Sequence, residues 1–526
     1  MINVVVYTGD ANANSVQSTR LGDNTLMSKL HHGTSLPTLS PIGLARLGAT
    51  FATETPATPL TGLHWGAINH AFADELGMTV GSLEAHGLAV LGGNAPWPGG
   101  PPSVATVYSG HQFGVWAGQL GDGRALFLGQ IQTQGGDWEL QLKGAGPTPY
   151  SRMGDGRAVL RSSIREYLCS EAMHGLGIPT SRALALVAAH TPVRRETLET
   201  AAIVTRAAPT FLRFGHFEHF AHHGKPEALR TLFDATLDAH FPDLKDLSIN
   251  EQVNAFAARV ASDTAALIAQ WQCVGFCHGV MNTDNMSVIG LTIDYGPFQF
   301  LDAFVPEHIC NHSDHNGRYA YNQQPQVGYW NVHALAQALA GLTTDVEALA
   351  ASIQCYPDAF TTTYTQVMRD KMGLVVPMEG DGELINDWQD LLAKDGVDYT
   401  IAWRTLSHAA EPTVMDPTQP PEALARWFID RAALGAWWQR FAERLQRQTP
   451  AERATQVARM LARNPKYVLR NHLAQEAILQ ATNGDFTMVN QLKAVFEQPF
   501  AEHPGYDHWA GLPPDWAKTL QISCSS

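Results

Sequence analysis

A polar segment in the middle of the chain, residues 278–296, sets the strongest limit on its fold and chemistry. It reads HGVMNTDNMSVIGLTIDYG, with Asp284 and Asn285 near its start and Asp294 near its end. The apolar run 287–293 between them favours a short β-hairpin, which would bring these side chains together. Two carboxylates and an amide that converge can bind a hard cation such as Mg²⁺ beside a nucleotide phosphate.

The order of these residues is similar to the catalytic loop and the Asp-Phe-Gly segment of protein kinases. In the kinase pattern HRDxxxxN, the metal-binding Asn is the seventh residue after His, and here that residue is Asn285. The kinase base is the second residue after His, and here it is Val280, which cannot accept a proton. The segment therefore predicts a kinase-like site without the usual base, and a simple polar turn is the alternative.

Composition limits the classes of protein to which the chain can belong. Its 526 residues are 45% hydrophobic, which suits a globular protein with a large core. With 35 basic and 50 acidic residues the net charge is −15, which argues against a nucleic-acid-binding surface. The sequence shows no long apolar span, no secretory signal and no disulfide scaffold, so we expect a cytoplasmic protein without a membrane partner.

A glycine-rich segment followed by two β-prone runs predicts a phosphate-binding region. Residues 108–124 contain five glycines, residues 125–132 are β-prone, and residues 138–143 alternate with period two and end in Lys143. Glycines let backbone N–H groups approach phosphate oxygens, although most such loops are structural turns. The meander is the stronger signal, because kinases carry their phosphate-binding lysine on the third strand.

A helix expected over residues 159–173 supplies a partner for this lysine. Glu166 and Glu171 are the candidates, and Glu166 is preferred because apolar positions flank it; a solvent-facing glutamate is the ordinary alternative. Two β-like runs, 183–189 and 201–207, follow. Arg206 and Arg213 stand in apolar surroundings, which suits either phosphate contact or a structural salt bridge.

These patterns predict an α+β protein with a kinase-like, two-lobed fold. Its β-rich lobe precedes a mainly helical lobe, in which residues 226–241, 250–272 and 330–342 have helical spacing. Helices are also expected over residues 64–76 and 464–481. The predicted division is an N-terminal extension 1–104, an N-lobe 105–220, a helical C-lobe 221–500 and a tail 501–526.

Several long motifs resemble the selenoprotein O family. They are YSGHQFGVWAGQLGDGR, ELQLKGAGPTPYSR, DGRAVLRSSIRE, HGVMNTDNMS, DYGPF, NHSDxxGRYxYxxQP and NPxYVLRN. The resemblance runs from about residue 60 to the C-terminus. Cys524 stands where eukaryotic members carry selenocysteine, so the chain is similar to the cysteine-containing bacterial form.

The resemblance implies a kinase-like protein that transfers AMP rather than the γ-phosphoryl group. ATP would lie flipped relative to a kinase, the acceptors would be Ser, Thr or Tyr hydroxyls of proteins, and pyrophosphate would leave. Asp284 would accept the hydroxyl proton, Glu166 would orient Lys143, and Asn285 and Asp294 would hold Mg²⁺ or Mn²⁺. The implied ATP contacts are Gly121, Gly123, Arg124, Lys143, Asp155, Gly156, Arg206, Arg213 and Asp294.

Three other functions stay open at this point. A conventional kinase would release ADP, and a protein uridylyltransferase would use UTP and Mn²⁺. A non-catalytic pseudokinase scaffold is favoured by Val280 but opposed by Lys143, Glu166, Asn285 and Asp294.

The cysteine near the C-terminus suggests a redox switch. We expect the terminus to be mobile and the thiol of Cys524 to be accessible, because exposed thiols are the ones that exchange and oxidise. A reversible disulfide between Cys310 and Cys524 would then pin the tail over the active site and lower activity. In a reducing cytoplasm the ordinary alternative is two free thiols.

Overall fold

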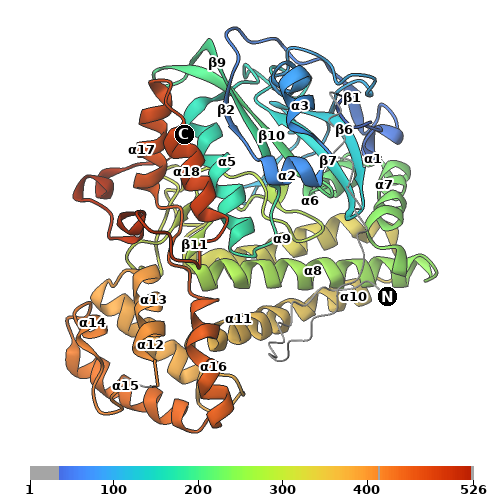
Figure 1. Cartoon of the computed structure of the whole chain (residues 1–526). Coiled ribbons are helices and arrows are strands. Elements are labelled where there is room, and N and C mark those ends of the chain that lie inside the picture. The colour runs from blue at the N-terminus through green and yellow to red at the C-terminus, as the bar shows by residue number, and fades with distance from the viewer. Residues whose placement is uncertain (1–34, 413–414, 523–526) are drawn as a thin grey trace, which may run out of the picture.

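The computed structural model describes residues 35–412 and 415–522, and Figure 1 shows their arrangement. An antiparallel sheet occupies the first half of the chain, and the second half is mainly helical. The predicted α+β class is therefore confirmed.

Eight strands form the main sheet, in the order β1-β3-β6-β7-β10-β9-β2, with β8 paired to β10. The four longest, β6, β7, β9 and β10, are those predicted from the sequence. Lys143 is the last residue of β7 and lies opposite Val204 of β10. The strands are β1 Ala52–Glu54, β2 His64–Ile68, β3 Val104–Thr106, β6 Ala125–Thr133, β7 Gly136–Lys143, β8 Ala158–Val159, β9 Arg182–Arg194 and β10 Leu198–Ala208.

The helix expected over residues 64–76 is wrong in its first half. Residues His64–Ile68 form β2, an edge strand whose Trp65 lies opposite Val187 of β9, and only His70–Glu75 form a helix, α2. Asn69 separates the two, because its side-chain oxygen accepts a hydrogen bond from Phe72 N and caps the helix. Strands β1 and β2 thus join the sheet although they precede residue 105, and the domain division at that point remains a prediction.

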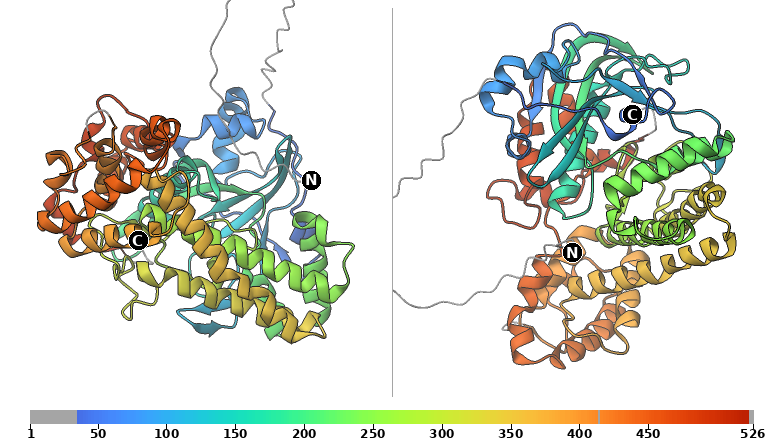
Figure 2. Two further views of the ribbon diagram at one scale, coloured as in Figure 1. Left: turned by 90° about the horizontal axis from the view of Figure 1, so that it is seen from below. Right: turned by 90° about the vertical axis from the view of Figure 1, so that its right-hand side faces the viewer.

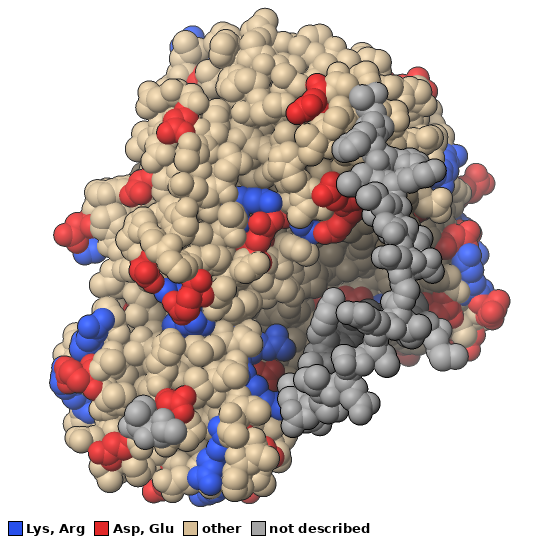
Figure 3. Space-filling model, in the orientation of Figure 1, with Lys and Arg blue, Asp and Glu red and all other residues tan. Residues whose placement is uncertain are grey.

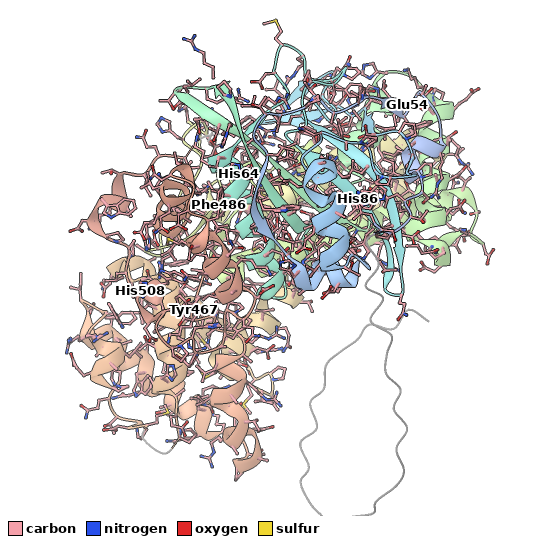
Figure 4. The ribbon with its side chains drawn as sticks, turned by 45° about the horizontal axis from the view of Figure 1, so that its top comes forward. Glu54, His64, His86, Tyr467, Phe486 and His508 are labelled. Carbon is pink, nitrogen blue, oxygen red and sulfur yellow. The ribbon has the colours of Figure 1, made fainter. Side chains whose placement is uncertain are left out.

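Helix α5, Leu160–Gly175, packs on β9 and β10, as the predicted helix over 159–173 requires. Two C-terminal helices, α17 Asn471–Thr482 and α18 Thr487–Phe496, cover α5 from the other side (Figure 1). The contact is close, since a Cβ added at Gly175 would lie 1.9 Å from the carbonyl oxygen of Phe496. The same C-terminal region reaches the sheet edge, where the rings of His64 and Phe486 meet at 5.8 Å between centroids (Figure 4).

The helix expected over 464–481 begins later than predicted. Helix α17 starts at Asn471, and its N-cap Arg470 is extended and fully buried. The guanidinium of Arg470 binds Asp398 at 2.9 Å and Asp302 at 2.5 Å. Arg470 makes these ion pairs from an extended backbone, although the local sequence pattern predicted a helix there.

The long helix α8, Ile249–Val274, forms the centre of the helical half. It begins at a capping box of Ser248 and Glu251 and ends at Gly275, whose φ of +70° is the left-handed conformation that favours glycine. The helices packed around or near it are α6 Phe214–His222, α7 Pro226–His240, α9 Gln324–Leu339, α10 Val346–Ser352 and α11 Tyr356–Met372. The helices predicted over 226–241, 250–272 and 330–342 are confirmed, with α9 beginning before residue 330.

A second hydrophobic core lies at one end of the molecule (Figure 2). Its helices are α12 Asp381–Asp395, α13 Tyr399–Ala409, α14 Glu422–Ala425, α15 Arg431–Gln446 and α16 Pro450–Leu461. Four buried tryptophans fill it: Trp388, Trp403, Trp437 and Trp438.

The polar segment 278–296 follows β11, Phe276–Cys277, but the hairpin predicted for residues 287–293 does not form. Ser287 and Thr292 instead make isolated bridges to Arg213 and Thr180, on either side of a turn at Gly290. The segment is therefore positioned by its neighbours rather than by its own strand pairing.

None of the helices in the described ranges is long and apolar enough to cross a membrane. On the face shown in Figure 3, acidic and basic side chains are interspersed.

Candidate active site

A cavity of about 670 Å³ lies between the sheet and the segment 278–296. All but one of the residues expected to contact nucleotide, metal or acceptor line it, and the exception, Glu166, lies directly behind Lys143. The lining residues among them are Gly121, Gly123, Arg124, Lys143, Asp155, Gly156, Arg206, Arg213, Asp284, Asn285 and Asp294. The structure thus brings the candidates together, while their individual roles remain predictions.

Three cations surround the carboxylate of Asp294. Lys143 Nζ lies 3.3 Å from Asp294 Oδ1, Arg206 Nη1 lies 2.5 Å from the same oxygen, and Arg213 binds Oδ2. Glu166 anchors two of these cations, since its oxygens lie 2.6 Å from Lys143 Nζ and 2.9 Å from Arg206 Nη1. Of the two glutamates considered above, Glu166 is the one that contacts Lys143, whereas Glu171 binds Arg182 at 2.8 Å.

Burial and charge act against each other in this network. Burial alone would raise the pKa of Asp294, but Arg213, Arg206 and Lys143 hold it well below its usual range. Burial lowers the pKa of Lys143, and Glu166 and Asp294 oppose that shift. The backbone of Asp294 has a φ of +60°, which is uncommon for a residue other than glycine and marks local strain.

Asp284 has a different environment from Asp294, although both are buried. Burial raises the pKa of Asp284 to about 7, against the opposing effect of Arg213. Its Oδ2 accepts a hydrogen bond of 3.3 Å from Gln112 Nε2, while its buried Oδ1 has no hydrogen-bond partner among the described residues. A buried carboxylate with a free oxygen and a pKa near neutrality can act as a general base.

The backbone around Asp284 is fixed by neighbouring elements. Arg213 Nη1 donates to the carbonyl oxygen of Asp284 at 2.8 Å, and the side-chain Nδ2 of Asn285 donates to the carbonyl oxygen of Val280 at 3.0 Å. His278, the first residue of the motif, is buried and binds the carbonyl oxygen of Ile293 through Nε2 at 3.0 Å. It therefore ties the start of the segment to its end.

The oxygen donors at the cavity suit a hard cation bound together with a nucleotide. Asp284, Asn285 and Asp294 supply carboxylate and amide oxygens, one of which, Asp284 Oδ1, lacks a partner within the described chain. Within residues 35–412 and 415–522 there is no cluster of three or more His, Cys, Asp or Glu side chains that could bind a metal unaided. A cation here would complete its shell with phosphate oxygens and water, as Mg²⁺ commonly does.

Two glycine-rich loops meet at the outer part of the cavity. Cβ atoms added at Gly121 and Gly123 would lie 2.7 Å and 2.9 Å from Tyr150 atoms, and one at Gly156 would lie 2.1 Å from Gly146 atoms. These positions therefore exclude larger residues. Arginines gather at the same rim: Arg124, Arg152, Arg157, Arg194 and Arg195.

Asp155 belongs to this rim rather than to the buried network. Its carboxylate binds Arg195 through two hydrogen bonds of 2.7 and 2.9 Å, which together with the neighbouring Arg157 N–H lower its pKa.

Sequence reasoning missed three residues of the cavity wall. Gln112 and Tyr108 lie beside Asp284 and Arg213, and Asp122 accepts hydrogen bonds from Thr106 N and Gln141 Nε2 at 2.8 and 3.3 Å. These three residues lie in the segment 108–124, whose glycines predicted a phosphate-binding loop or a structural turn and did not single out the side chains between them.

The structure describes only one of the two cysteines in the predicted disulfide. Cys310 is buried, and its thiol donates to the carbonyl oxygen of Cys277 at 3.5 Å. Cys524 lies outside the described residues, so the proposed pair stays a prediction.

Comparison with known proteins identifies the family to which this chain belongs. Residues 40–497 match the family model described as "Protein adenylyltransferase SelO". A protein of Variovorax paradoxus named protein nucleotidyltransferase YdiU is 55% identical over 489 residues, covering 92% of this chain and 96% of the relative. A protein of the same name from Ralstonia nicotianae is 51% identical over 507 residues, covering 92% and 95%. The chain therefore belongs to the SelO family and is a protein nucleotidyltransferase.

Proposed function

We propose that this enzyme transfers AMP from ATP to Ser, Thr or Tyr hydroxyls of proteins and releases pyrophosphate. The observation that carries the proposal is the convergence of Lys143, Arg206 and Arg213 on one point of the cavity. Three buried cations at one end of a nucleotide site suit a highly charged leaving group better than a single transferred phosphoryl group. Val280 at the kinase base position supports the same conclusion.

The reaction can be followed through the residues of the cavity. The acceptor hydroxyl attacks the α-phosphorus, a new P–O bond forms to the protein, and the bond from the α-phosphorus to pyrophosphate breaks. Asp284 accepts the hydroxyl proton, for which its neutral-range pKa and its free Oδ1 are suited. Lys143, Arg206 and Arg213 stabilise the charge that develops on pyrophosphate.

Asn285 and Asp294 would hold Mg²⁺ or Mn²⁺ against the triphosphate. When bound, the cation would neutralise phosphate charge and orient the triphosphate. Asp294 contacts three cationic side chains in this structure, so these side chains would share the carboxylate with the metal or turn to the phosphates.

The proposal includes a kinase-like relation between the sheet and the helical half. It rests on the strand lysine Lys143, the helix glutamate Glu166 and the order of Asn285 and Asp294 along the chain. The flipped orientation of ATP is part of the same proposal. Protein acceptors follow from the family, and a cytoplasmic location remains a prediction from the sequence.

Parallel labelling tests the nucleotide and the reaction type. The enzyme is incubated with an acceptor protein and ATP labelled at the α- or the γ-phosphate, or UTP labelled at the α-phosphate, with Mg²⁺ or Mn²⁺. We expect protein labelling from α-labelled ATP and none from γ-labelled ATP. Labelling from γ-labelled ATP would identify a kinase, preferential labelling from UTP a uridylyltransferase, and no labelling under any condition a scaffold.

A further inference from the structure

The hairpin of β4, Gly110–Gln112, and β5, Val115–Ala117, is not used by the proposed function. Its turn is Phe113-Gly114, with φ values of +51° and +78°, as expected for a tight two-residue hairpin turn. The hairpin lies against α6 and the loop that carries Asp284.

Two backbone N–H groups of this hairpin donate to side chains of the segment 278–296, and one of them also donates to Tyr319. His111 N donates to Thr283 Oγ1 at 2.7 Å, and Phe113 N donates to Asn282 Oδ1 at 3.2 Å and to Tyr319 Oη at 2.9 Å. The approach is close, because a Cβ added at Gly110 would lie 2.9 Å from Thr283 Oγ1 and 3.0 Å from Asp284 N.

The other side of the hairpin is anchored to α6. His111 Nδ1 lies 2.6 Å from Oε1 of Glu218, whose side chain is fully buried. The strand position of Gln112 is therefore fixed from both sides, by α6 and by residues 282–283.

From this position the side chain of Gln112 reaches the carboxylate of Asp284. Nε2 donates to Asp284 Oδ2 at 3.3 Å, and both residues line the cavity. One oxygen is thereby occupied, while Oδ1 keeps no partner among the described residues. A carboxylate held by one oxygen presents the other in a fixed direction.

We propose that Gln112 is a positioning residue that orients Asp284 for proton transfer from the acceptor hydroxyl. The inference rests on the proposed function, in which Asp284 is the base. It gives the β4–β5 hairpin a role on the acceptor side of the site, apart from nucleotide binding.

The test compares Gln112→Met, which keeps side-chain length and removes the donor, with Gln112→Glu, which replaces the donor by an acceptor. Initial rates of protein labelling from α-labelled ATP give kcat and the KM for ATP. We expect Gln112→Met to lower kcat by about 10- to 100-fold, the size expected for a hydrogen bond to a charged group, with little change in KM for ATP. Gln112→Glu should lose at least as much, because two carboxylates would then face each other.

A matched control and a double mutant separate positioning from a structural role. Gln130→Met removes a similar side-chain amide on β6, where it binds Asp137, and should leave kcat unchanged. In an Asp284→Ala background, Gln112→Met should cost nothing further, since its partner is absent. An additive loss there, a raised KM with normal kcat, or parental kinetics of Gln112→Met would overturn the inference. Full activity of Asp284→Ala alone would instead overturn the proposed function.

Discussion

Lys143, at the end of β7, and Glu166, in the middle of α5, form an ion pair of 2.6 Å. The second oxygen of Glu166 binds Arg206, so one carboxylate positions two of the three cations of the cavity. Helices α17 and α18 pack on the other side of α5 and so help to position the helix that carries Glu166. The cationic end of the site is thus assembled by packing that involves the C-terminal part of the chain.

Replacement of Glu166 should affect activity through these cations. We expect Glu166→Gln to lower AMP transfer by about 100-fold or more, because Lys143 and Arg206 lose the anion that orients them. Initial rates with α-labelled ATP measure the effect.

Glu171→Gln is the matched control on the same helix. Glu171 binds Arg182, Asn69 and the backbone N–H of Ala183, away from the cavity. Breaking this buried pair should cost about 3–5 kcal/mol of folding stability, with kinetic constants near the parent's for the protein that remains folded. Equal kinetic losses in both variants would show that Glu166 acts only through the stability of α5.

Asp294→Asn should abolish AMP transfer and alter the response of the metal-free protein to pyrophosphate. Without the carboxylate, Lys143, Arg206 and Arg213 lose their shared anion, so the melting temperature in chelator should fall. Added pyrophosphate should then raise that temperature more in the variant than in the parent, because the cations no longer pair with Asp294. A smaller rise in the variant would count against pyrophosphate binding at these cations.

Asp284 should make folding stability depend on pH in metal-free buffer. Its pKa in the folded protein is about 7 against an ordinary value of 3.8, so between these pH values the folded state keeps a proton that the unfolded state has released. Stability therefore falls as pH rises through this window and levels above it. Asp284→Asn lacks this loss, so its stability relative to the parent should grow from about pH 4 to 7, as measured by denaturant unfolding in chelator. A constant difference across that range would contradict the shift.

Val280→Asp tests the orientation of ATP. This substitution restores a carboxylate at the kinase base position, on the cavity wall. If ATP lies flipped, the γ-phosphorus is not presented to the acceptor hydroxyl, and γ-label should not enter protein. Strong γ-label incorporation by this variant would count against the flipped orientation.

The residues show why part of this site could be predicted and part could not. The run 138–143 alternates and ends in Lys143, so local pattern alone located the strand. The expected hairpin over 287–293 fails because Ser287 and Thr292 bridge to Arg213 and Thr180, contacts that no local pattern encodes. The β4–β5 hairpin was likewise hidden, because its contact with Asp284 spans 172 residues of sequence.

A contact between the described part of the tail and the segment that follows Cys310 bears on the hypothesis of a Cys310–Cys524 disulfide. His312 N donates to the carbonyl oxygen of Ile522 at 2.8 Å. His312 follows Cys310 by two residues in the sequence, and Ile522 precedes Cys524 by two. Cys310 also lies against the catalytic segment, since a Cβ added at Gly279 would be 2.6 Å from its sulfur. A covalent link at Cys310 would therefore disturb the loop that carries Asp284.

We expect dithiothreitol to raise AMP transfer by air-oxidised enzyme, and Cys524→Ser to remove that dependence. Burial raises the pKa of the Cys310 thiol well above its usual range, so oxidation should be slow and should start from Cys524. Cys355→Ser is a suitable control, because Cys355 is a half-buried cysteine that binds Ala258 on α8. A reductant response in Cys524→Ser equal to the parent's would show that the tail is not the switch.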